Sequence, residues 1–391
     1  FDWAVQTLDS PTCRTACAEA GTDKERLLAL GMMLSFQAYL GVYWYSNDKV
    51  VALIRRSLDL LQPLGRSNEL AVAQWMAGYF HVVEDLVTDE RFVRESLDYF
   101  REVGDRCWVA RCLMSLAYDF SDSGDSKSDL LHQSLDISRE IGDRWNTAHA
   151  LFTLGESAHA EGDFDEARRR FQQCLAIRRA IGDRQGIGIV CDYIGYVLRE
   201  MGRYDEAKGL HHESLAIAEE VGDQLGIAGS LDNLALVARD EGHLDEARTL
   251  VEDGLAIRRV IARGWETAIS LEHQGTISAA LGEMDLAEEQ FQESLEISRQ
   301  QPWPQGVAMA LIGLSDVFAT RGEMAKSRQH AASALMLGSL IGNRVVNQQV
   351  LSCAARRLSE AGQPQRAAEV LAYVLADRAT SRYTRIHAEP L

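Results

Sequence analysis

A period of 40 residues, marked by glycine, runs through most of this chain. Six glycines follow one another at intervals of 40 residues from Gly162 to Gly362. A second series passes through Gly142, Gly182 and Gly222 with the same spacing. A fixed period of this length is typical of solenoids, propellers and other arrays, in which each unit buries its apolar face against its neighbours. The period therefore predicts a repeat protein.

Each 40-residue unit is predicted to hold two helices. Between Gly182 and Gly202, and again between Gly202 and Gly222, the apolar residues recur at spacings of three and four, which is helical spacing. Glycine at these joints suits the left-handed residue that ends many helices. Small residues such as Gly195 and Ala207 mark the points where two helix backbones can approach closely.

These positions resemble a known family. Leu-Gly or Leu-Ala on the first helix, Gly-x-x-x-x-Ala at the joint and the aromatic residues Phe171 and Phe291 look like tetratricopeptide repeats. The standard repeat has about 34 residues, so each unit here has room for about an extra turn and a half of helix. The long form, with its ending SLAI-x-x-x-x-GD, resembles the repeats of kinesin light chains. It also resembles the C-terminal arrays of bacterial signal-transduction (STAND-type) ATPases and related transcription regulators.

The resemblance implies an all-α fold, a right-handed α-α superhelix (a TPR solenoid) of about nine helix-turn-helix repeats over residues 22–379. Residues 1–21 are predicted to be an N-terminal stub or linker, and residues 380–391 a C-terminal tail. The predicted repeats are 22–65, 66–104, 105–142, 143–182, 183–222, 223–262, 263–302, 303–342 and 343–379. No low-complexity linker or change of composition interrupts them, so the sequence predicts one continuous array.

Charge and hydropathy limit the partners. The net charge of −18 argues against general nucleic-acid binding, which needs a cationic face, and permits basic partners. The stretch from Leu27 to Asn47 has no charged residue and is long enough to span a bilayer. It contains Ser35 and Gln37, however, and falls where the array needs a first helix, so we expect a buried helix and no membrane insertion.

The two ends of the sequence bear on its location. No signal peptide is recognisable, which predicts a cytoplasmic protein. The chain begins with Phe1 in place of an initiator Met, which suggests an excised or processed piece of a longer chain.

The sequence contains none of the common motifs of catalysis. It has no G-x-x-x-x-G-K-[ST] phosphate loop, no G-x-S-x-G and no H-E-x-x-H. The seven cysteines lie near no His pair with zinc-site spacing, so no metal and no cofactor are predicted. His211 occupies the repeat position that Phe171 and Phe291 fill, which favours a packed core imidazole over a catalytic one. We therefore expect a protein that is not an enzyme.

What remains is a surface on the first helices, which in this architecture line the inside of the curve. Stepping along them by four, three and four residues, past the expected core positions, gives an inner stripe. The predicted partner-binding residues are Trp145, His149, Phe152, Glu156, Ile189, Asp192, Tyr196, Arg199, Asp232, Asn233, Leu236, Arg239, Trp265, Ile269, Glu272 and Thr276.

Two rows of charge recur on this stripe. Asp192, Asp232 and Glu272 are 40 residues apart, and Arg199 and Arg239 form a second row. If the carboxylates face a groove, they predict Lys or Arg on the bound segment. The alternative is that Asp192 and Arg199 pair between repeats as a lattice.

Large aromatic residues share the predicted stripe. Exposed aromatic side chains beside fixed charges are typical of binding hot spots, and Trp145 and Trp265 are the main candidates. The alternative is that both pack onto the helix of the next repeat. The phrase LDNLALVARDEG resembles the kinesin light chains, in which an Asn at the position of Asn233 can hold the backbone of a peptide.

These features together predict a binding and sensing module. Its ligand would be an extended or helical protein segment in the concave groove of repeats four to seven. The resemblance implies the C-terminal sensor arm of a larger bacterial signalling ATPase or regulator, held against its own nucleotide-binding domain until a ligand frees it. The alternative is a free-standing scaffold that tethers a protein cargo.

Overall fold

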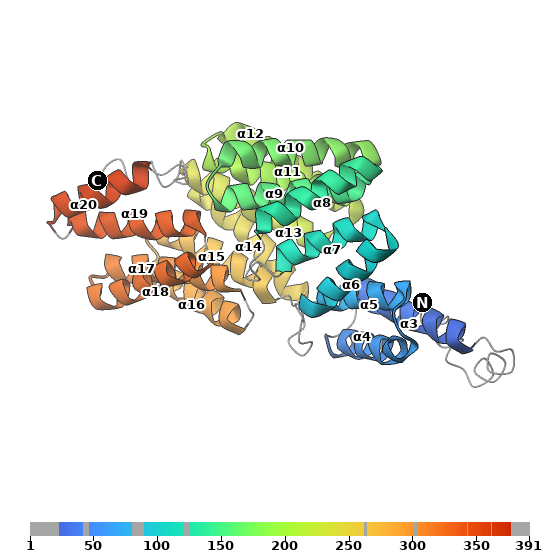
Figure 1. The fold of residues 1–391 in the computed structure, drawn as a ribbon. Helices are drawn as coiled ribbons and strands as arrows, with labels where there is room; N and C mark the ends of the chain where they lie inside the picture. The colour runs from blue at the N-terminus through green and yellow to red at the C-terminus, as the bar shows by residue number, and fades with distance from the viewer. Residues whose placement is uncertain are drawn as a thin grey trace. The chain divides into compact units, whose positions relative to one another are not determined.

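Helices make up all of the regular structure in the part of the chain that the structure describes. The computed structural model describes residues 23–41, 47–79, 90–119, 126–261, 264–300, 303–341, 343–360 and 362–376. Over these ranges the chain is a succession of α-helices, joined by tight turns and one short 3₁₀ segment (Figure 1). The all-α prediction is therefore confirmed. The predicted N-terminal stub and C-terminal tail lie outside the described residues.

The helices follow one another in pairs, and each pair consists of a first helix and a second helix. The early pairs are α3 (Asp23–Gly41) with α4 (Asn47–Leu61) and the 3₁₀ segment η1 (Gln62–Leu64), α5 (Asn68–Tyr79) with α6 (Glu90–Val103), and α7 (Arg106–Asp119) with α8 (Lys127–Ile141). The middle pairs are α9 (Arg144–Ala160) with α10 (Phe164–Ile181), α11 (Arg184–Glu200) with α12 (Tyr204–Val221), and α13 (Gln224–Asp240) with α14 (Leu244–Ile261). The last are α15 (Gly264–Ala280) with α16 (Met284–Gln300), α17 (Pro304–Thr320) with α18 (Met324–Leu340), and α19 (Arg344–Glu360) with α20 (Pro364–Ala376).

The chain falls into two compact units, Phe1–Thr153 and Leu154–Leu391. The boundary lies inside α9, at a place where the sequence shows no break in the array. Each unit is built from consecutive helix pairs, the packing that is typical of a solenoid of repeats. Most of the candidate site lies in the second unit.

A Gly-Asp pair ends one helix and begins the next. Gly182 has a φ of 74°, the left-handed conformation in which glycine is favoured, and caps the C-terminus of α10. The amide of the following residue, Asp183, donates to the carbonyl of Arg178 at 3.0 Å. The Asp183 carboxylate then accepts from the Gly186 amide at 2.9 Å and caps α11. The dipeptide thus fixes the joint between two repeats.

Glycine also sets how closely the two helices of a pair approach. A Cβ atom on Gly155 of α9 would lie 2.6 Å from the Phe171 ring, and one on Gly195 of α11 would lie 2.6 Å from the His211 ring. His211 is fully buried in the position that Phe171 takes one repeat earlier. The prediction that His211 is a packed core imidazole is confirmed.

The uncharged stretch near the N-terminus forms part of α3, which packs against α4. Leu30 and Leu34 are buried, and the Ser35 and Ser57 hydroxyls lie 2.6 Å apart between the two helices. Over the described residues, no helix combines the length and the apolar character that crossing a membrane requires. The buried-helix prediction is confirmed for this part of the stretch, and residues 42–46 lie outside the described residues.

Candidate partner-binding site

Two predicted anchors on the first helices of the second unit are exposed. Ile189 on α11 is 42% exposed and Trp265 on α15 is 43% exposed. The Trp265 ring meets the Trp303 ring edge-on, with 6.1 Å between their centroids. Trp303 directly precedes the first helix of the next repeat. Trp265 therefore packs toward that repeat with part of its indole, as the alternative predicts, and the rest of the ring is exposed.

Tyr193 is a further exposed side chain on α11 that sequence reasoning passed over. Its hydroxyl donates to the Glu156 carboxylate of α9 at 3.2 Å. It occupies the repeat position of Asn233, one of the predicted site residues, and that correspondence is the signal that would have found it. Asn233 itself is half-buried, so a role in holding a peptide backbone stays a prediction.

Three predicted residues, Trp145, His149 and Phe152, lie in the first unit. Trp145 is exposed and packs edge-on against His149 on its own helix, with 5.3 Å between the ring centroids. The alternative that Trp145 packs against the next repeat therefore does not account for its exposed surface. Phe152 is half-buried.

The carboxylate of Asp192 joins three helices of the second unit. His211 Nδ1 of α12 lies 2.7 Å from Asp192 Oδ1, and the Ser230 hydroxyl of α13 donates to Asp192 Oδ2 at 2.8 Å. The hydroxyl oxygens of Ser230 and Ser214 lie 3.0 Å apart. Both oxygens of Asp192 are thus engaged inside the array.

Asp232 repeats this arrangement 40 residues later. The Ser270 hydroxyl of α15 donates to Asp232 Oδ2 at 2.8 Å, and the Arg258 guanidinium of α14 pairs with the same oxygen. Asp232 is only 1% exposed, and this burial raises its pKa to about 6, although the charge of Arg258 acts in the opposite direction. The carboxylates therefore bond between repeats, as the lattice alternative predicts. Asp192, however, pairs with His211 and Ser230, and Arg199 has other partners.

The arginine row is part of a buried charge cluster. Arg199 pairs with the adjacent Glu200, its Nε lies 3.4 Å from Asp240 Oδ2 on α13, and its guanidinium lies 4.9 Å from the centre of the Tyr196 ring. Arg239 Nε donates to Asp240 Oδ1 at 2.9 Å. Burial alone would lower the pKa of Arg199, but the carboxylates of Glu200 and Asp240 outweigh it and raise that pKa. Arg199 therefore stays charged.

Groups on the neighbouring helices complete this cluster. Burial raises the pKa of Glu272 on α15, opposed first by Arg239, and the Thr276 hydroxyl donates to its Oε1 at 3.2 Å. His159 on α9 packs edge-on against Tyr196, with 5.2 Å between the ring centroids, and burial lowers its pKa. Desolvation therefore favours a neutral His159 at neutral pH, which fits a packed ring.

The predicted exposure is wrong for three residues. Arg199, Asp232 and Leu236 are buried. The stripe was defined from the periodicity of one helix at a time, whereas the first helices of adjacent repeats bond to each other through Arg199–Asp240 and Ser270–Asp232. The first helix of the following repeat thus helps to bury residues that the periodicity of a single helix predicts to be exposed. Ile269, Tyr196, Arg239, Glu272 and Thr276 keep partial exposure.

The arrangement of the polar side chains around Asp192 favours binding over catalysis. Asp192, His211 and Ser230 bring an acid, an imidazole and a hydroxyl together, but Ser230 bonds to the carboxylate and not to the imidazole. His211 Nε2 lies against Gly195, where even a Cβ would be 2.7 Å away. A substrate has no room there. Within the described ranges, no group of three His, Cys, Asp or Glu side chains is placed to hold a metal ion.

Comparisons with known proteins place this fold. The tetratricopeptide repeat family model matches residues 129–180 and 191–259. No curated protein sequence matches the chain. Among solved structures, a Rap protein complexed with Competence and Sporulation Factor has a TM-score of 0.58 at 12% identity, over 90% of this chain and 88% of that one.

Two further structures are similar over almost the same length. The Rap conjugation gene regulator of plasmid pLS20, in complex with the Phr* peptide, has a TM-score of 0.54 at 13% identity, over 88% of this chain and 84% of that one. A STAND protein with a tetratricopeptide repeat sensor from Pyrococcus horikoshii has a TM-score of 0.54 at 17% identity. That match covers 88% of this chain and 54% of the archaeal one. At these identities the likeness is one of fold.

Proposed function

We propose that this chain, a tetratricopeptide repeat array, binds a peptide or protein segment on the first-helix face of its second unit. We use "first-helix face" for the surface of α11, α13 and α15 that carries Ile189, Tyr193 and Trp265. The fold is one that serves protein interaction and sensing. The particular ligand and the use of this face are our inference.

The observation that carries the proposal is the exposure of Ile189 and Trp265. Each lies on a helix whose neighbouring apolar residues, such as Val190 and Leu271, are buried. Folding therefore does not require these two side chains at the surface. Trp265 also packs edge-on against Trp303, which restricts its ring in the absence of a ligand. Ordered, exposed apolar anchors of this kind are where binding energy is concentrated.

The side chains of the first-helix face that can contact a ligand indicate the chemistry of that ligand. The carboxylates of Asp192 and Asp232 accept bonds from within the array, so they give no reason to expect Lys or Arg on the ligand. The large exposed side chains by which this face is defined, Ile189, Tyr193 and Trp265, are apolar or aromatic. We therefore infer an apolar or amphipathic segment as the ligand. Two of the similar structures are complexes, one with a Phr* peptide and one with Competence and Sporulation Factor, which is consistent with this use of the fold.

The test is a peptide-display selection on the purified chain, followed by calorimetry with the selected peptide. Trp265→Ala should weaken binding by about 2 kcal/mol or more, because it removes a desolvated anchor. Ile189→Glu should weaken it too. Val260→Ala is the matched control, since Val260 is exposed but lies on the second helix α14. Unchanged affinity in a folded Trp265→Ala protein would refute the use of this face.

We further propose that the array is the sensor arm of a longer cytoplasmic signalling protein, with no turnover of its own. The similar STAND protein supports this, because an array of this size makes up about half of that chain. The check is to size the endogenous polypeptide and read its gene upstream of Phe1. A phosphate loop upstream would support the sensor arm. A native chain that starts within a few residues of Phe1 would leave the free-standing scaffold, and ATP hydrolysis by the array alone would contradict both.

A further inference from the structure

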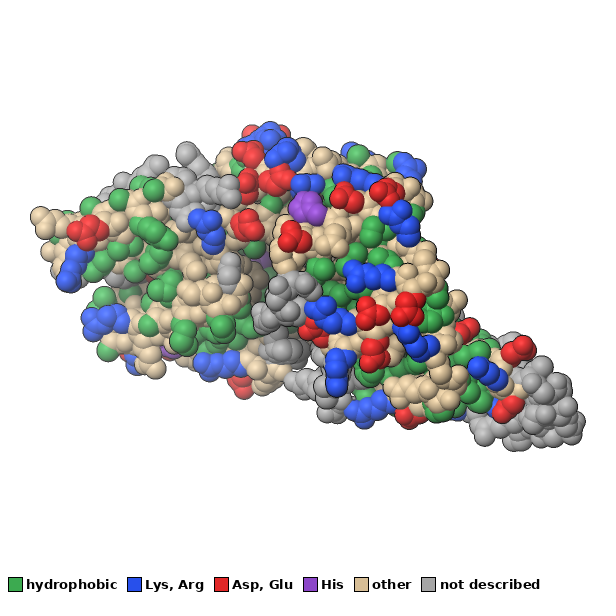
Figure 2. All heavy atoms as spheres, viewed as in Figure 1, with side chains coloured by type: hydrophobic (Ala, Val, Ile, Leu, Met, Phe, Trp, Pro, Cys, Tyr) green, Lys and Arg blue, Asp and Glu red, His purple; other side chains and the backbone are tan. Residues whose placement is uncertain are grey.

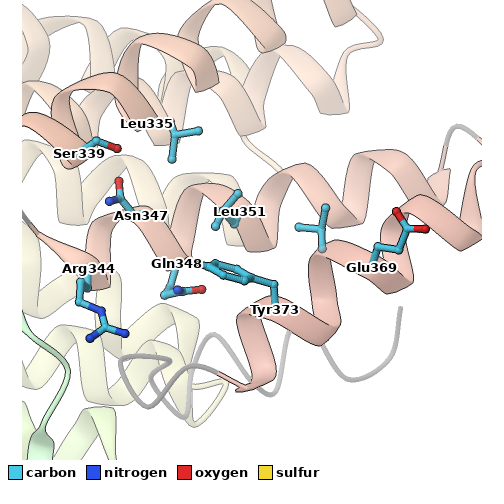
Figure 3. Close-up of a pocket in the computed structure, with 9 residues that line it drawn as sticks. Leu335, Ser339, Arg344, Asn347, Gln348, Leu351, Glu369 and Tyr373 are labelled. Atoms are coloured by element: carbon cyan, nitrogen blue, oxygen red, sulfur yellow. The ribbon is translucent and has the colours of Figure 1, made fainter.

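A second candidate surface lies on the second helices of the last repeats, at the C-terminal end of the second unit. We use "outer groove" for the pocket of about 530 Å³ between α18 and α20, floored by α19. Its apolar lining comes from Leu335 of α18, Leu351 of α19, and Val370 and Tyr373 of α20. Figure 3 shows Leu335, Leu351 and Ser339 around a common space, with the Tyr373 ring extending from α20 toward Gln348 of α19.

Earlier in the second unit, ion pairs bridge the corresponding second helices. Arg179 of α10 pairs with Glu213 of α12 at 2.6 Å. Two repeats later, at the same positions of the period, Arg259 of α14 lies 3.6 Å from Glu293 of α16. In each case the pair spans the space between one second helix and the next.

The outer groove lacks this bridge. The positions that correspond to Arg179 and Glu213 are Ser339 and Tyr373, which cannot form an ion pair. No ion pair crosses the groove at these positions, and its lining there is a serine hydroxyl and an aromatic ring.

The surface around the outer groove is unusually apolar. Met336 and Leu340 on α18 are 68% and 80% exposed, and Tyr373 on α20 is 62% exposed. Figure 2 shows hydrophobic side chains gathered over α17 to α20. Apolar side chains clustered this way mark an interaction site more often than a solvated face.

The charge around the outer groove is also unlike that of the rest of the chain. From Trp303 to Ala376 the sequence has seven Arg or Lys and four Asp or Glu, whereas the whole chain carries −18. Arg344 lines the pocket, and among its described lining residues Glu369 is the one carboxylate. Arg328 lies seven residues before Leu335, and Arg366 lies four residues before Val370. Each arginine is therefore on the same helix face as that apolar residue, and both arginines are exposed. The rim of the groove is therefore cationic.

We propose that the outer groove binds an acidic amphipathic helix of a partner protein. A helix laid between α18 and α20 would place an apolar stripe, at spacings of three and four, against Leu335, Val370 and Tyr373. Acidic residues flanking that stripe would meet Arg328, Arg344 and Arg366. A second copy of this chain is the other occupant that the experiments below distinguish from a partner helix. This surface is separate from the first-helix face.

The probe is a fluorescent designed peptide of about 18 residues, or roughly five helical turns, with a leucine stripe flanked by glutamates. The comparison peptide has lysine at every glutamate. Fluorescence anisotropy at physiological salt should show the acidic peptide binding at least about tenfold more tightly than the basic one. Equal binding of both peptides, or binding of neither, would overturn the proposal.

A double variant can place an ion pair across the groove, and we call it the closing variant. Ser339→Arg combined with Tyr373→Glu installs the residues that form the bridge between α10 and α12. It should weaken binding of the acidic peptide at least about tenfold with unchanged helicity. Val260→Glu, which alters an exposed apolar residue on α14, is the control and should bind as the wild type does. A folded closing variant that binds like the wild type would also overturn the proposal.

Three further measurements separate the remaining outcomes. Arg328→Glu with Arg366→Glu changes only exposed charges, so it should fold, and it should reverse the preference between the two peptides. Sedimentation velocity tests self-association: wild-type dimers that the closing variant abolishes would assign the groove to a second copy and refute our proposal. Trp265→Ala should leave binding of the acidic peptide unchanged, so failure here and failure at the first-helix face are distinguishable.

Discussion

At the scale of single residues, the array is held in register by carboxylates that look like ligand contacts in the sequence. Asp192 accepts from Ser230, and Asp232 accepts from Ser270, and both bonds join residues 38 apart. The same bond therefore occurs at corresponding positions of two successive repeats. Arg258 adds a cation at the second of these sites. Their role is to bind one repeat to the next.

Replacing Asp232 tests this role. Asp232→Asn should lower the free energy of unfolding by about 3–5 kcal/mol, because it leaves the buried charge of Arg258 without a counterion. Arg258→Met in the same chain should restore much of the loss. Denaturant titrations of the two single variants and the double variant measure the coupling. Asp253→Asn, an exposed carboxylate on α14, is the control, and an equally small effect at Asp232 would contradict the lattice.

At the scale of helices, the Gly-Asp joints decide where each element ends and begins. Gly222 has a φ of 72° and caps α12, and Asp223 accepts from the Gly226 amide at 3.0 Å to cap α13. These interactions are local in sequence, so they form whatever the rest of the chain does. They explain why the helix pairs follow the period of the sequence so closely.

The cap can be tested separately from the core. Asp223→Ala should cost about 1 kcal/mol of stability, because the first turn of α13 loses an acceptor for its amide. Asp245→Ala is the matched control: Asp245 also lies in the first turn of a helix, α14, but is exposed and caps no amide that the structure records. It should change stability by a few tenths of a kcal/mol. Equal losses in thermal unfolding would show that the Asp223 cap contributes nothing specific.

At the scale of the whole molecule, each repeat packs on its immediate neighbours. In the second unit, α11 packs against α13, and α13 against α15, through the bonds of Asp192, Asp232 and Arg199. Stability in such arrays is close to a sum of repeat and nearest-neighbour contributions. A local defect should therefore stay local.

Hydrogen exchange can follow such a defect along the chain. Asp232→Asn should speed amide exchange in α11 to α15, the helices that its bonds connect, and leave α17 to α20 near wild-type protection. Exchange measured by mass spectrometry on peptide fragments resolves these regions. Uniform loss of protection through α20 would show that the second unit unfolds as one cooperative body.

The sequence by itself determined the helix pairs, their joints and the core position of His211. Each of these depends on spacings of three and four or on a capping dipeptide, which are short-range in the chain. The exposed anchors Ile189 and Trp265 were also predictable, because they lie on the outward side of their own helices.

Only the tertiary structure decided which polar residues of the first helices stay exposed. Periodicity places Asp232 and Arg199 outside the apolar stripe of their own helices, yet both are buried, and the next repeat supplies Ser270 and Asp240 to meet them. The outer groove is likewise lined by residues far apart in the sequence, such as Ser339 and Tyr373 on two different second helices. Periodicity describes one helix at a time, whereas burial and bonding between repeats depend on the lateral distance between helices, which no single helix contains.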